Sequence, residues 1–219
     1  MRGRRQSIED ALTLYFIMGS TNCTKDPVEV LREAIEGGIT LFQFREKGSG
    51  ALEGKEKLEL AVKLQEECRS AGIPFIVNDD VDLAAAIDAD GVHIGQEDER
   101  ASEVREKIGP DKWLGVSTHT LEEAEQAIAD GADYLGLGPI YPTISKDDAE
   151  KVHGLDIIKR FRTKGIETPI VGIGGIDSSN GRAVIDAGAN GISLISAIAG
   201  ADNIRVAAEE LKQAVGDEI

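Results

Sequence analysis

A recurring glycine is the feature of this sequence that most restricts its fold. At six places a stretch with helical spacing of apolar residues ends near a Gly, and a short apolar run follows. The six sites are Gly37-Gly38-Ile39, Ala71-Gly72-Ile73, Ala89-Asp-Gly91-Val92, Asp130-Gly131-Ala132, Lys164-Gly165-Ile166 and Ala187-Gly188-Ala189. A glycine just past a helix is typical of a left-handed C-cap. We therefore interpret each site as a junction from a helix to a strand.

Between these junctions the pattern alternates between strand and helix. Apolar runs of strand length are expected at 14–18, 41–45, 75–78, 91–94, 113–117, 134–138, 170–172 and 191–194. Helices are expected between them, for example at 27–36, 55–70, 121–130 and 203–215, where apolar residues repeat at helical spacing. The runs are apolar throughout, as expected for strands covered on both faces. Eight such units predict one α/β domain over residues 1–219, a (β/α)8 TIM barrel with residues 1–10 as an N-terminal extension.

Composition restricts the class of protein and its partners. The chain has 219 residues, 41% of them hydrophobic and 29% charged, as in an ordinary soluble domain. Its net charge of −16 argues against a nucleic-acid or anionic-membrane surface, so an anionic ligand would have to be held by local cations or a metal. Cys23 and Cys68 suggest neither a disulfide framework nor a metal site. With no signal peptide and no apolar run of transmembrane length, we expect a cytoplasmic protein whose oligomeric state is unknown.

Two strand ends near the C-terminus carry small residues. Glycines at 172, 174 and 175 follow Val171, and Ile195-Ser196-Ala197 follows Leu194. Bare backbone and the first turn of a helix both favour an anion, and the last two strand ends of a barrel often hold phosphate. The alternative is that these glycines only form tight turns.

Charged residues follow three other strands. Arg45 and Lys47 follow the second strand and are candidates to bind phosphate, or else they form a solvated turn paired to Glu46. Acids follow the third strand, at Asp79 and Asp80, and the fourth, at Glu97 and Asp98, and acids on adjacent strand ends are candidates to share Mg²⁺, a cation that prefers oxygen ligands. Alternatively, Asp79 or its neighbour caps the next helix.

Three further features lie at or near strand ends. His93 lies within a strand and is interpreted as a core histidine. Ser117 either binds a ligand or helps to start a helix. The loop from the sixth strand to about Leu155 is long and charged, which is typical of a functional lid or a mobile surface. Within it, Lys146 follows the hydroxyl residues Thr143 and Ser145, a set suited to a phosphorylated ligand.

Together these segments closely resemble the thiamine-phosphate synthase family. The matching motifs are Gln43-Phe-Arg-Glu-Lys47, Val77-Asn-Asp-Asp80, His93-Ile-Gly-Gln-Glu-Asp98, Gly115-Val-Ser117, Gly136-Leu-Gly-Pro-Ile-Tyr-Pro-Thr143 and Gly172-Ile-Gly-Gly-Ile176. They occur in the family's order, and the resemblance extends from Tyr15 to Ser196. It implies a transferase of alkyl groups that joins hydroxymethylpyrimidine diphosphate to a thiazole phosphate, or its carboxylated form, giving thiamine phosphate and pyrophosphate. Loss of pyrophosphate would leave a pyrimidine-methyl cation, which the thiazole nitrogen captures.

The resemblance also implies a role for individual residues. The pyrimidine diphosphate would contact Gln43, Phe44, Arg45, Glu46, Lys47, Asn78, Ser117 and Lys146, of which Arg45, Lys47, Ser117 and Lys146 would be catalytic. The thiazole phosphate would contact Thr143, Ile144, Ser145, Gly175, Ile195 and Ser196. Asp79 and Asp98 would bind Mg²⁺ on the pyrophosphate. The family's lid usually reads Pro-Thr-x-Thr-Lys, and Ser145 keeps a hydroxyl where the second Thr stands.

Other functions on a similar barrel are alternatives. A thiazole tautomerase and a non-catalytic thiamine-phosphate binding protein would have no use for the full diphosphate and metal set. A phosphosugar isomerase or epimerase would share only the phosphate site. The expected partners are small molecules, with no nucleic acid and no membrane.

Overall fold

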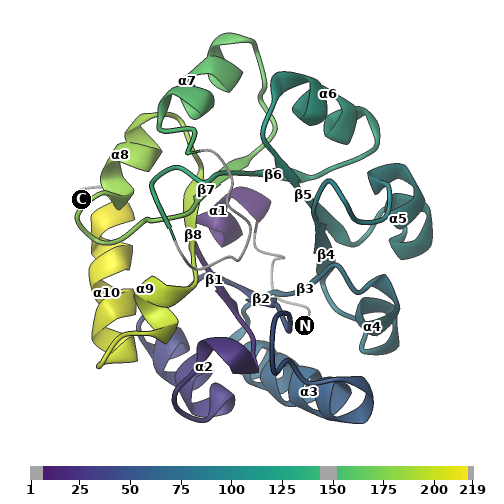
Figure 1. The fold of residues 1–219 in the computed structure, drawn as a ribbon, viewed down its shortest axis with the longest axis vertical. Coiled ribbons are helices and arrows are strands. Elements are labelled where there is room, and N and C mark those ends of the chain that lie inside the picture. Colours follow the sequence, from purple (N-terminus) through teal and green to yellow (C-terminus); the bar gives the residue numbers. More distant parts are fainter. Residues whose placement is uncertain (1–6, 144–151, 217–219) are drawn as a thin grey trace.

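The (β/α)8 barrel predicted from the sequence is confirmed. The computed structural model describes residues 7–143 and 152–216. Eight parallel strands pair in chain order, and pairing of the last with the first closes the barrel (Figure 1). The strands are β1 (Leu14–Met18), β2 (Leu41–Phe44), β3 (Phe75–Asn78), β4 (Gly91–Ile94), β5 (Trp113–Thr118), β6 (Tyr134–Leu137), β7 (Ile170–Ile173) and β8 (Gly191–Leu194). Within the described residues, no helix combines the length and the apolar character needed to span a membrane.

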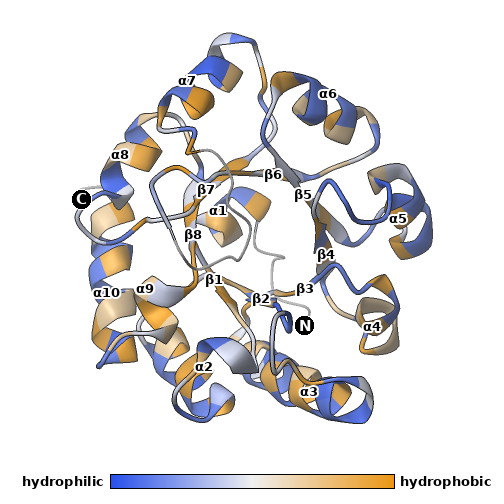
Figure 2. Ribbon diagram, in the orientation of Figure 1, coloured by the Kyte–Doolittle hydropathy of each residue, from blue (hydrophilic) through white to orange (hydrophobic). Residues whose placement is uncertain are grey.

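Ten helices and one 3-10 turn accompany the strands in the described residues, and all of the helices but α1 surround the barrel. They are α1 (Ile8–Leu12), the 3-10 turn η1 (Ser20–Asn22), α2 (Pro27–Glu36), α3 (Gly54–Ala71), α4 (Val81–Ala86), α5 (Ala101–Ile108), α6 (Leu121–Ala129), α7 (Asp156–Thr163), α8 (Gly181–Asp186), α9 (Ser196–Ala199) and α10 (Ile204–Val215). Local signals start several of them: Asp26 caps α2 before Pro27, and Thr120 forms a capping box with Glu123 at α6. The apolar face of each outer helix packs on the strands, and polar residues face outward (Figure 2).

Alternation along each strand divides the apolar core into two layers. Side chains such as Phe16 and Phe42 point outward and fill the layer between strands and helices. Side chains such as Tyr15, Leu41 and Tyr134 point inward and fill the barrel with α1, which lies at the centre of the ring in Figure 1. The sequence pattern does not predict α1, because five residues are too few to show helical periodicity. The side chains on the inward face of each strand are therefore the ones that reach the barrel interior.

The helix-to-strand junctions follow the glycine pattern with one exception. Backbone φ is positive at five of the six expected glycines, namely Gly38, Gly72, Gly131, Gly165 and Gly188. At the remaining junction Gly91 begins β4, and Asp88 adopts the left-handed conformation with φ 52°. Gly91 begins the strand as predicted, but the left-handed C-cap expected there was wrong. The helix α4 already ends at Ala86, and Ala89 N donates to Ala84 O to close it. Aspartate is one of the few residues that adopts this conformation at modest cost.

Arg105 ties two consecutive strands together at their amino ends. It leaves the last turn of α5, and its guanidinium donates to Gly109 O and Lys112 O, each at 2.7 Å, just before β5. It also donates to Gly131 O at 2.8 Å and pairs with Asp133 at 2.5 Å, just before β6. One side chain thus satisfies three part-buried loop carbonyls.

Arg162 repeats this arrangement two units later. From α7 it donates to Ile166 O at 2.7 Å and Thr168 O at 2.9 Å, before β7. It also donates to Gly188 O at 2.9 Å and to Asn190 Oδ1 at 2.7 Å, before β8. The two arginines therefore stabilise the end of the barrel that lies opposite the strands' carboxyl ends.

We expect Arg105→Ala and Arg162→Ala each to lower the free energy of unfolding by about 2–3 kcal/mol, because several carbonyls lose a charged donor at once. Chemical denaturation measures the change. Arg32→Ala is the matched control: its side chain is 57% exposed and forms a two-bond pair with Glu67 alone, so the unfolding midpoint should barely change. Equal losses in all three variants would contradict this account.

Candidate active site

Residues from all eight strands line one polar cavity of about 770 Å³ at the carboxyl end of the barrel. Its lining comprises Tyr15, Ile17, Gln43, Arg45, Lys47, Asn78, Asp79, His93, Gly95, Gln96, Glu97, Asp98, Ser117, His119, Gly136, Val171, Ile173 and Ser193. Seven residues expected to hold the pyrimidine diphosphate or Mg²⁺ are among them: Gln43, Arg45, Lys47, Asn78, Asp79, Asp98 and Ser117. The fold thus brings together groups that lie up to 74 positions apart in the chain (43 to 117).

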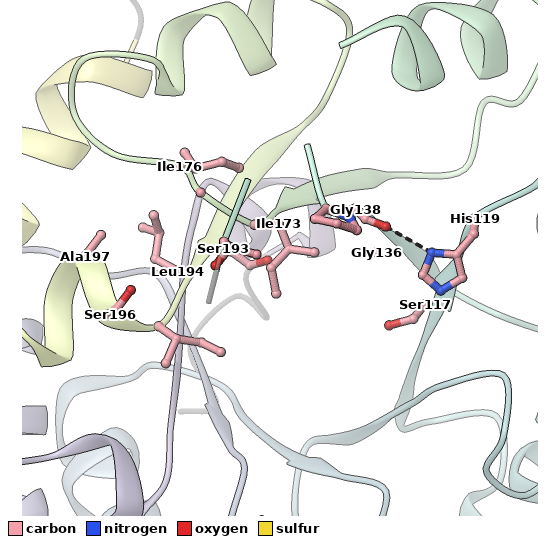
Figure 3. A pocket seen from close by; sticks show the side chains of 15 residues that line it. Ser117, His119, Gly136, Gly138, Ile173, Ile176, Ser193, Leu194, Ser196 and Ala197 are labelled. Atoms are coloured by element: carbon pink, nitrogen blue, oxygen red, sulfur yellow. Dashed lines mark hydrogen bonds between the residues drawn. The ribbon is translucent and has the colours of Figure 1, made fainter. Parts of the chain in front are cut away.

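A smaller and more apolar cavity of about 60 Å³ adjoins the first (Figure 3). Thr143, Gly175, Ile195 and Ser196, four of the residues expected to hold the thiazole phosphate, line it. The two cavities share Ser117, His119, Gly136, Ile173 and Ser193. A ligand in either cavity would therefore lie against the same wall.

The glycine-rich turn after β7 borders the smaller cavity. Gly174 and Gly175 have φ of 96° and 63°, which glycine adopts without strain. A Cβ on Gly174 would lie 2.7 Å from Pro139 Cβ, and one on Gly175 would lie 2.5 Å from Pro142 O. These glycines thus form a tight turn and also let the β6–α7 loop approach closely. Ile195 and Ser196 follow β8 and begin the short helix α9, as the sequence suggested.

Two neighbouring aspartates after β3 have different surroundings. Asp80 caps α4 by accepting from Leu83 N at 2.9 Å, and it pairs with Lys57 at 2.6 Å. Asp79 has φ of 60° and faces the cavity, where its carboxylate lies 2.5 Å from Lys47 Nζ. The helix cap and the candidate metal ligand are therefore adjacent residues.

The carboxyl groups of Asp79 and Asp98 influence each other's pKa. Burial raises the pKa of Asp79 above its usual range, and the neighbouring Asp98 acts in the same direction against Lys47. Burial also acts to raise the pKa of Asp98, but hydrogen bonds from Asp79 and from Gly95 N, at 2.7 Å, lower it below its usual range. The two carboxyls thus lie close enough for each to shift the pKa of the other. No group of three or more His, Cys, Asp or Glu in the described residues could hold a metal, so a cation here would need further oxygen ligands.

The cations after β2 do not pair with Glu46, so that alternative is wrong. Glu46 instead accepts from Ser20 N at 2.8 Å, from Ser20 Oγ at 2.6 Å and from Leu52 N at 2.8 Å, which ties two loops together. Lys47 pairs with Asp79. Arg45 lines the cavity and forms no ion pair with another described side chain.

Two described residues expected to contact the pyrimidine diphosphate, Phe44 and Glu46, do not line the larger cavity. Phe44 is buried in the outer layer, with its ring centroid 6.3 Å from that of Phe75. Glu46 holds the loops described above. Ile144, Ser145 and Lys146 lie outside the described residues.

A chain of hydrogen bonds runs beneath the larger cavity. Gln43 Nε2 donates to Tyr15 Oη at 2.6 Å, and Tyr15 Oη lies 2.9 Å from Tyr134 Oη. Tyr134 Oη lies 3.1 Å from His93 Nδ1, and His93 Nε2 lies 2.9 Å from Ser117 Oγ. His93 is indeed buried, yet it also lines the cavity.

Sequence reasoning missed several of these polar residues. It treated Tyr15 and Tyr134 only as parts of apolar strands, although both occupy inward positions. It also missed Gln96, whose Nε2 donates to Ser117 O at 2.6 Å, and His119, whose Nδ1 lies 2.9 Å from Gly138 O (Figure 3). A polar residue at an inward position of a predicted strand is the signal that could have found the two tyrosines.

Comparisons with known proteins agree with this site. A family model described as thiamine monophosphate synthase matches residues 14–198. A thiamine-phosphate synthase from Geobacillus thermodenitrificans is 60% identical over 210 residues, covering 96% of this chain and 95% of that protein. One from Bacillus cereus (strain ZK / E33L) is 58% identical over 208 residues, covering 95% and 94%.

Solved structures are similar as well. A thiamine phosphate pyrophosphorylase from Pyrococcus furiosus has a TM-score of 0.85 and 39% identity, covering 95% of this chain and 98% of that one. A 3-hexulose-6-phosphate synthase, at 16% identity and a TM-score of 0.68, shares the fold alone. Since sequence and fold match the same enzymes over nearly their whole length, this chain belongs to the thiamine-phosphate synthase family.

Proposed function

We propose that this chain is a cytoplasmic transferase that joins 4-amino-2-methyl-5-hydroxymethylpyrimidine diphosphate to a thiazole phosphate, giving thiamine phosphate and pyrophosphate. The observation that carries the proposal is the pair of adjoining cavities with a common wall that includes Ser117, Gly136 and Ser193. Two ligands held there would meet across that wall. The free thiols of Cys23 and Cys68 suit a reducing compartment.

The larger cavity suits the pyrimidine diphosphate. Gln43, Asn78 and Ser117 offer polar groups to the ring, and Arg45 and Lys47 offer charge to the diphosphate. Local cations of this kind let a chain with a net charge of −16 bind an anion. Lys146, from the loop after β6, would add a third cation, and Phe44 and Glu46 would contribute through the backbone of the same segment.

The smaller cavity suits the thiazole phosphate. Its apolar wall fits a thiazole ring, and the turn at Gly175 with the start of α9 at Ser196 offers backbone to a phosphate. Thr143 lies at the rim and would add a hydroxyl, as would Ser145. Ile144 and Ile195 would complete the contact.

Asp79 and Asp98 fit Mg²⁺. A cation between these two neighbouring carboxyls would stabilise the charged form of both, and diphosphate oxygens would supply the further ligands that two carboxylates lack. Bound there, Mg²⁺ would supply positive charge for the departing pyrophosphate. Asp79 would then give up its contact with Lys47, which becomes available to the diphosphate.

The chemistry is an ionisation followed by capture. The bond between the pyrimidine methylene carbon and the diphosphate oxygen breaks, and the electron pair leaves with the diphosphate. Arg45, Lys47 and Lys146 stabilise the charge that develops on the leaving group, which is the kind of preorganised interaction that lowers a barrier most. The thiazole nitrogen then donates its electron pair to the methylene carbon. A tautomerase would need only the smaller cavity, and a thiamine-phosphate binding protein would have no use for the full diphosphate and metal set.

The direct test mixes purified protein, both precursors and Mg²⁺. Thiamine phosphate and pyrophosphate should form in equal amounts, as measured by chromatography and a coupled pyrophosphate assay. Isomerisation of the thiazole without any coupling would refute the proposal.

The two aspartates after β3 allow a matched test of the metal site. Asp79→Asn should raise the Mg²⁺ concentration needed for half-maximal rate by tenfold or more, as a lost metal ligand commonly does. Asp80→Asn should leave the Mg²⁺ requirement unchanged, because this residue caps α4 and pairs with Lys57. Steady-state rates over a Mg²⁺ titration distinguish the two. An equal shift in both variants would argue against Asp79 as a ligand.

The two lysines that pair with these aspartates test the diphosphate clamp. Lys47→Ala should lower kcat/KM for the pyrimidine diphosphate by about 10²–10³, since it removes a positive charge that would stabilise the leaving group. Lys57→Ala removes an equivalent ion pair outside the cavity and should leave that constant within a few-fold. Binding of the thiazole phosphate, measured by calorimetry, should be similar in both variants. A comparable loss of thiazole binding in Lys47→Ala would mean that the subsites are misassigned.

A further inference from the structure

The hydrogen-bond chain beneath the cavity has a direction that its first donor fixes. Gln43 Nε2 can only donate, and it donates to Tyr15 Oη. Tyr15 is 1% exposed, and the other partner of its hydroxyl among the described residues is Tyr134 Oη. A buried hydroxyl that donates to nothing is costly, so Tyr15 donates its single hydrogen to Tyr134.

The donors and acceptors at Tyr134 and His93 follow from the same argument. Tyr134 is fully buried and has accepted from Tyr15, so its own hydrogen goes to His93 Nδ1. A histidine that accepts at Nδ1 is neutral and carries its hydrogen on Nε2. His93 Nε2 therefore donates to Ser117 Oγ. An imidazolium would donate at both nitrogens and would conflict with the donor at Gln43.

Burial keeps both tyrosines in the state that this direction needs. Burial raises the pKa of Tyr15 above its usual value, although its hydrogen bonds with Tyr134 and Gln43 act to lower it. Burial likewise raises the pKa of Tyr134 well above its usual value, and the neighbouring Tyr15 adds to this effect. Both phenols thus remain protonated and able to donate.

Glycine on β5 makes room for the link between Tyr134 and His93. Gly115 lies in register with His93 on one side and with Tyr134 on the other. A Cβ on Gly115 would overlap both the Tyr134 ring and His93 Nδ1. Gly136 is tight as well, since a Cβ there would lie 3.2 Å from His93 Cε1. Any other residue at 115 would separate the two rings. Only glycine at this position leaves room for the hydrogen bond between Tyr134 and His93.

We propose that this chain of hydrogen bonds makes Ser117 a donor toward the bound pyrimidine precursor, with Tyr15, Tyr134 and His93 as positioning residues. Because Ser117 Oγ accepts from His93, its own hydrogen is directed to an acceptor atom of the ligand. At the other end, donation by Nε2 leaves Oε1 of Gln43 to accept from a donor of the ligand. The identity of that ligand rests on the proposed function, whereas the direction of the chain does not.

The ring of His93 reports the direction of the chain. We would label the histidines with ¹⁵N and record two-bond ¹⁵N–¹H correlations on the whole protein without substrate at neutral pH. The sequence has three histidines, so His119→Asn and His153→Asn identify the signals of His93 by elimination. We expect hydrogen on Nε2 alone. Hydrogen on Nδ1, or on both nitrogens, would overturn the proposal because the donors would then run the other way.

Tyr134→Phe tests whether the chain acts on catalysis. It removes the donor to His93, so kcat should fall about tenfold and KM for the thiazole phosphate should stay the same, while His93 shows a mixture of tautomers. Thr118→Val is the control, because it removes from β5, the strand of Ser117, a buried hydroxyl that takes no part in the chain. If Tyr134→Phe does not fold, Tyr15→Phe breaks the chain one link earlier.

Two outcomes separate this proposal from the proposed function. An unchanged tautomer and kcat in the tyrosine variant would overturn the positioning role even if the protein couples both precursors. Failure of wild-type protein to couple them, with hydrogen on Nε2 of His93, would refute the function and leave the donor direction of Ser117 supported.

Discussion

Pairing between β1 and β8 closes the sheet into a barrel, so every inward side chain has to find its packing or hydrogen-bond partners inside it. The interior of an eight-stranded barrel is just wide enough to be filled by side chains. The part of the interior nearer the amino ends of the strands is apolar, with Leu41 and Ile76 packed on Leu12 of α1. The part nearer the carboxyl ends is polar, because Gln43, His93 and Ser117 take the inward positions there. A rigid apolar base thus supports the polar cavity, so cavity residues are held by the barrel and not by loops alone.

Local charge, not net charge, sets the electrostatics of the cavity. The chain as a whole is acidic, yet Arg45 and Lys47 line the cavity beside Asp79 and Asp98. Lys47 pairs with Asp79 there, so two of these opposite charges already balance each other. A net charge of −16 gives the chain little long-range attraction for nucleic acid, whereas the cavity places two cations locally.

Polar groups inside the barrel require a complete set of partners. Tyr15 and Tyr134 are buried, and the hydroxyl of each is satisfied by the other and by one more side chain, Gln43 on β2 for Tyr15 and His93 on β4 for Tyr134. Fully paired networks of this type hold their members in one geometry, whereas an unpaired member would be destabilising. The same requirement links the fold to the site, because the last member, Ser117, lies on the wall between the two cavities.

The sequence by itself determined the barrel and most strand boundaries, because glycine caps and apolar periodicity are local properties of the chain. Four strands, including β1 and β8, match the expected ranges, and residues such as Arg45 and Asp98 were identified from their position after a strand. Only the tertiary structure decided that Asp79 faces the cavity while Asp80 caps α4, and that Glu46 ties loops instead of pairing with its neighbours. The hydrogen bond between Tyr15 and Tyr134 joins residues 119 positions apart. Such a contact depends on strand register and barrel closure, which local sequence patterns do not encode.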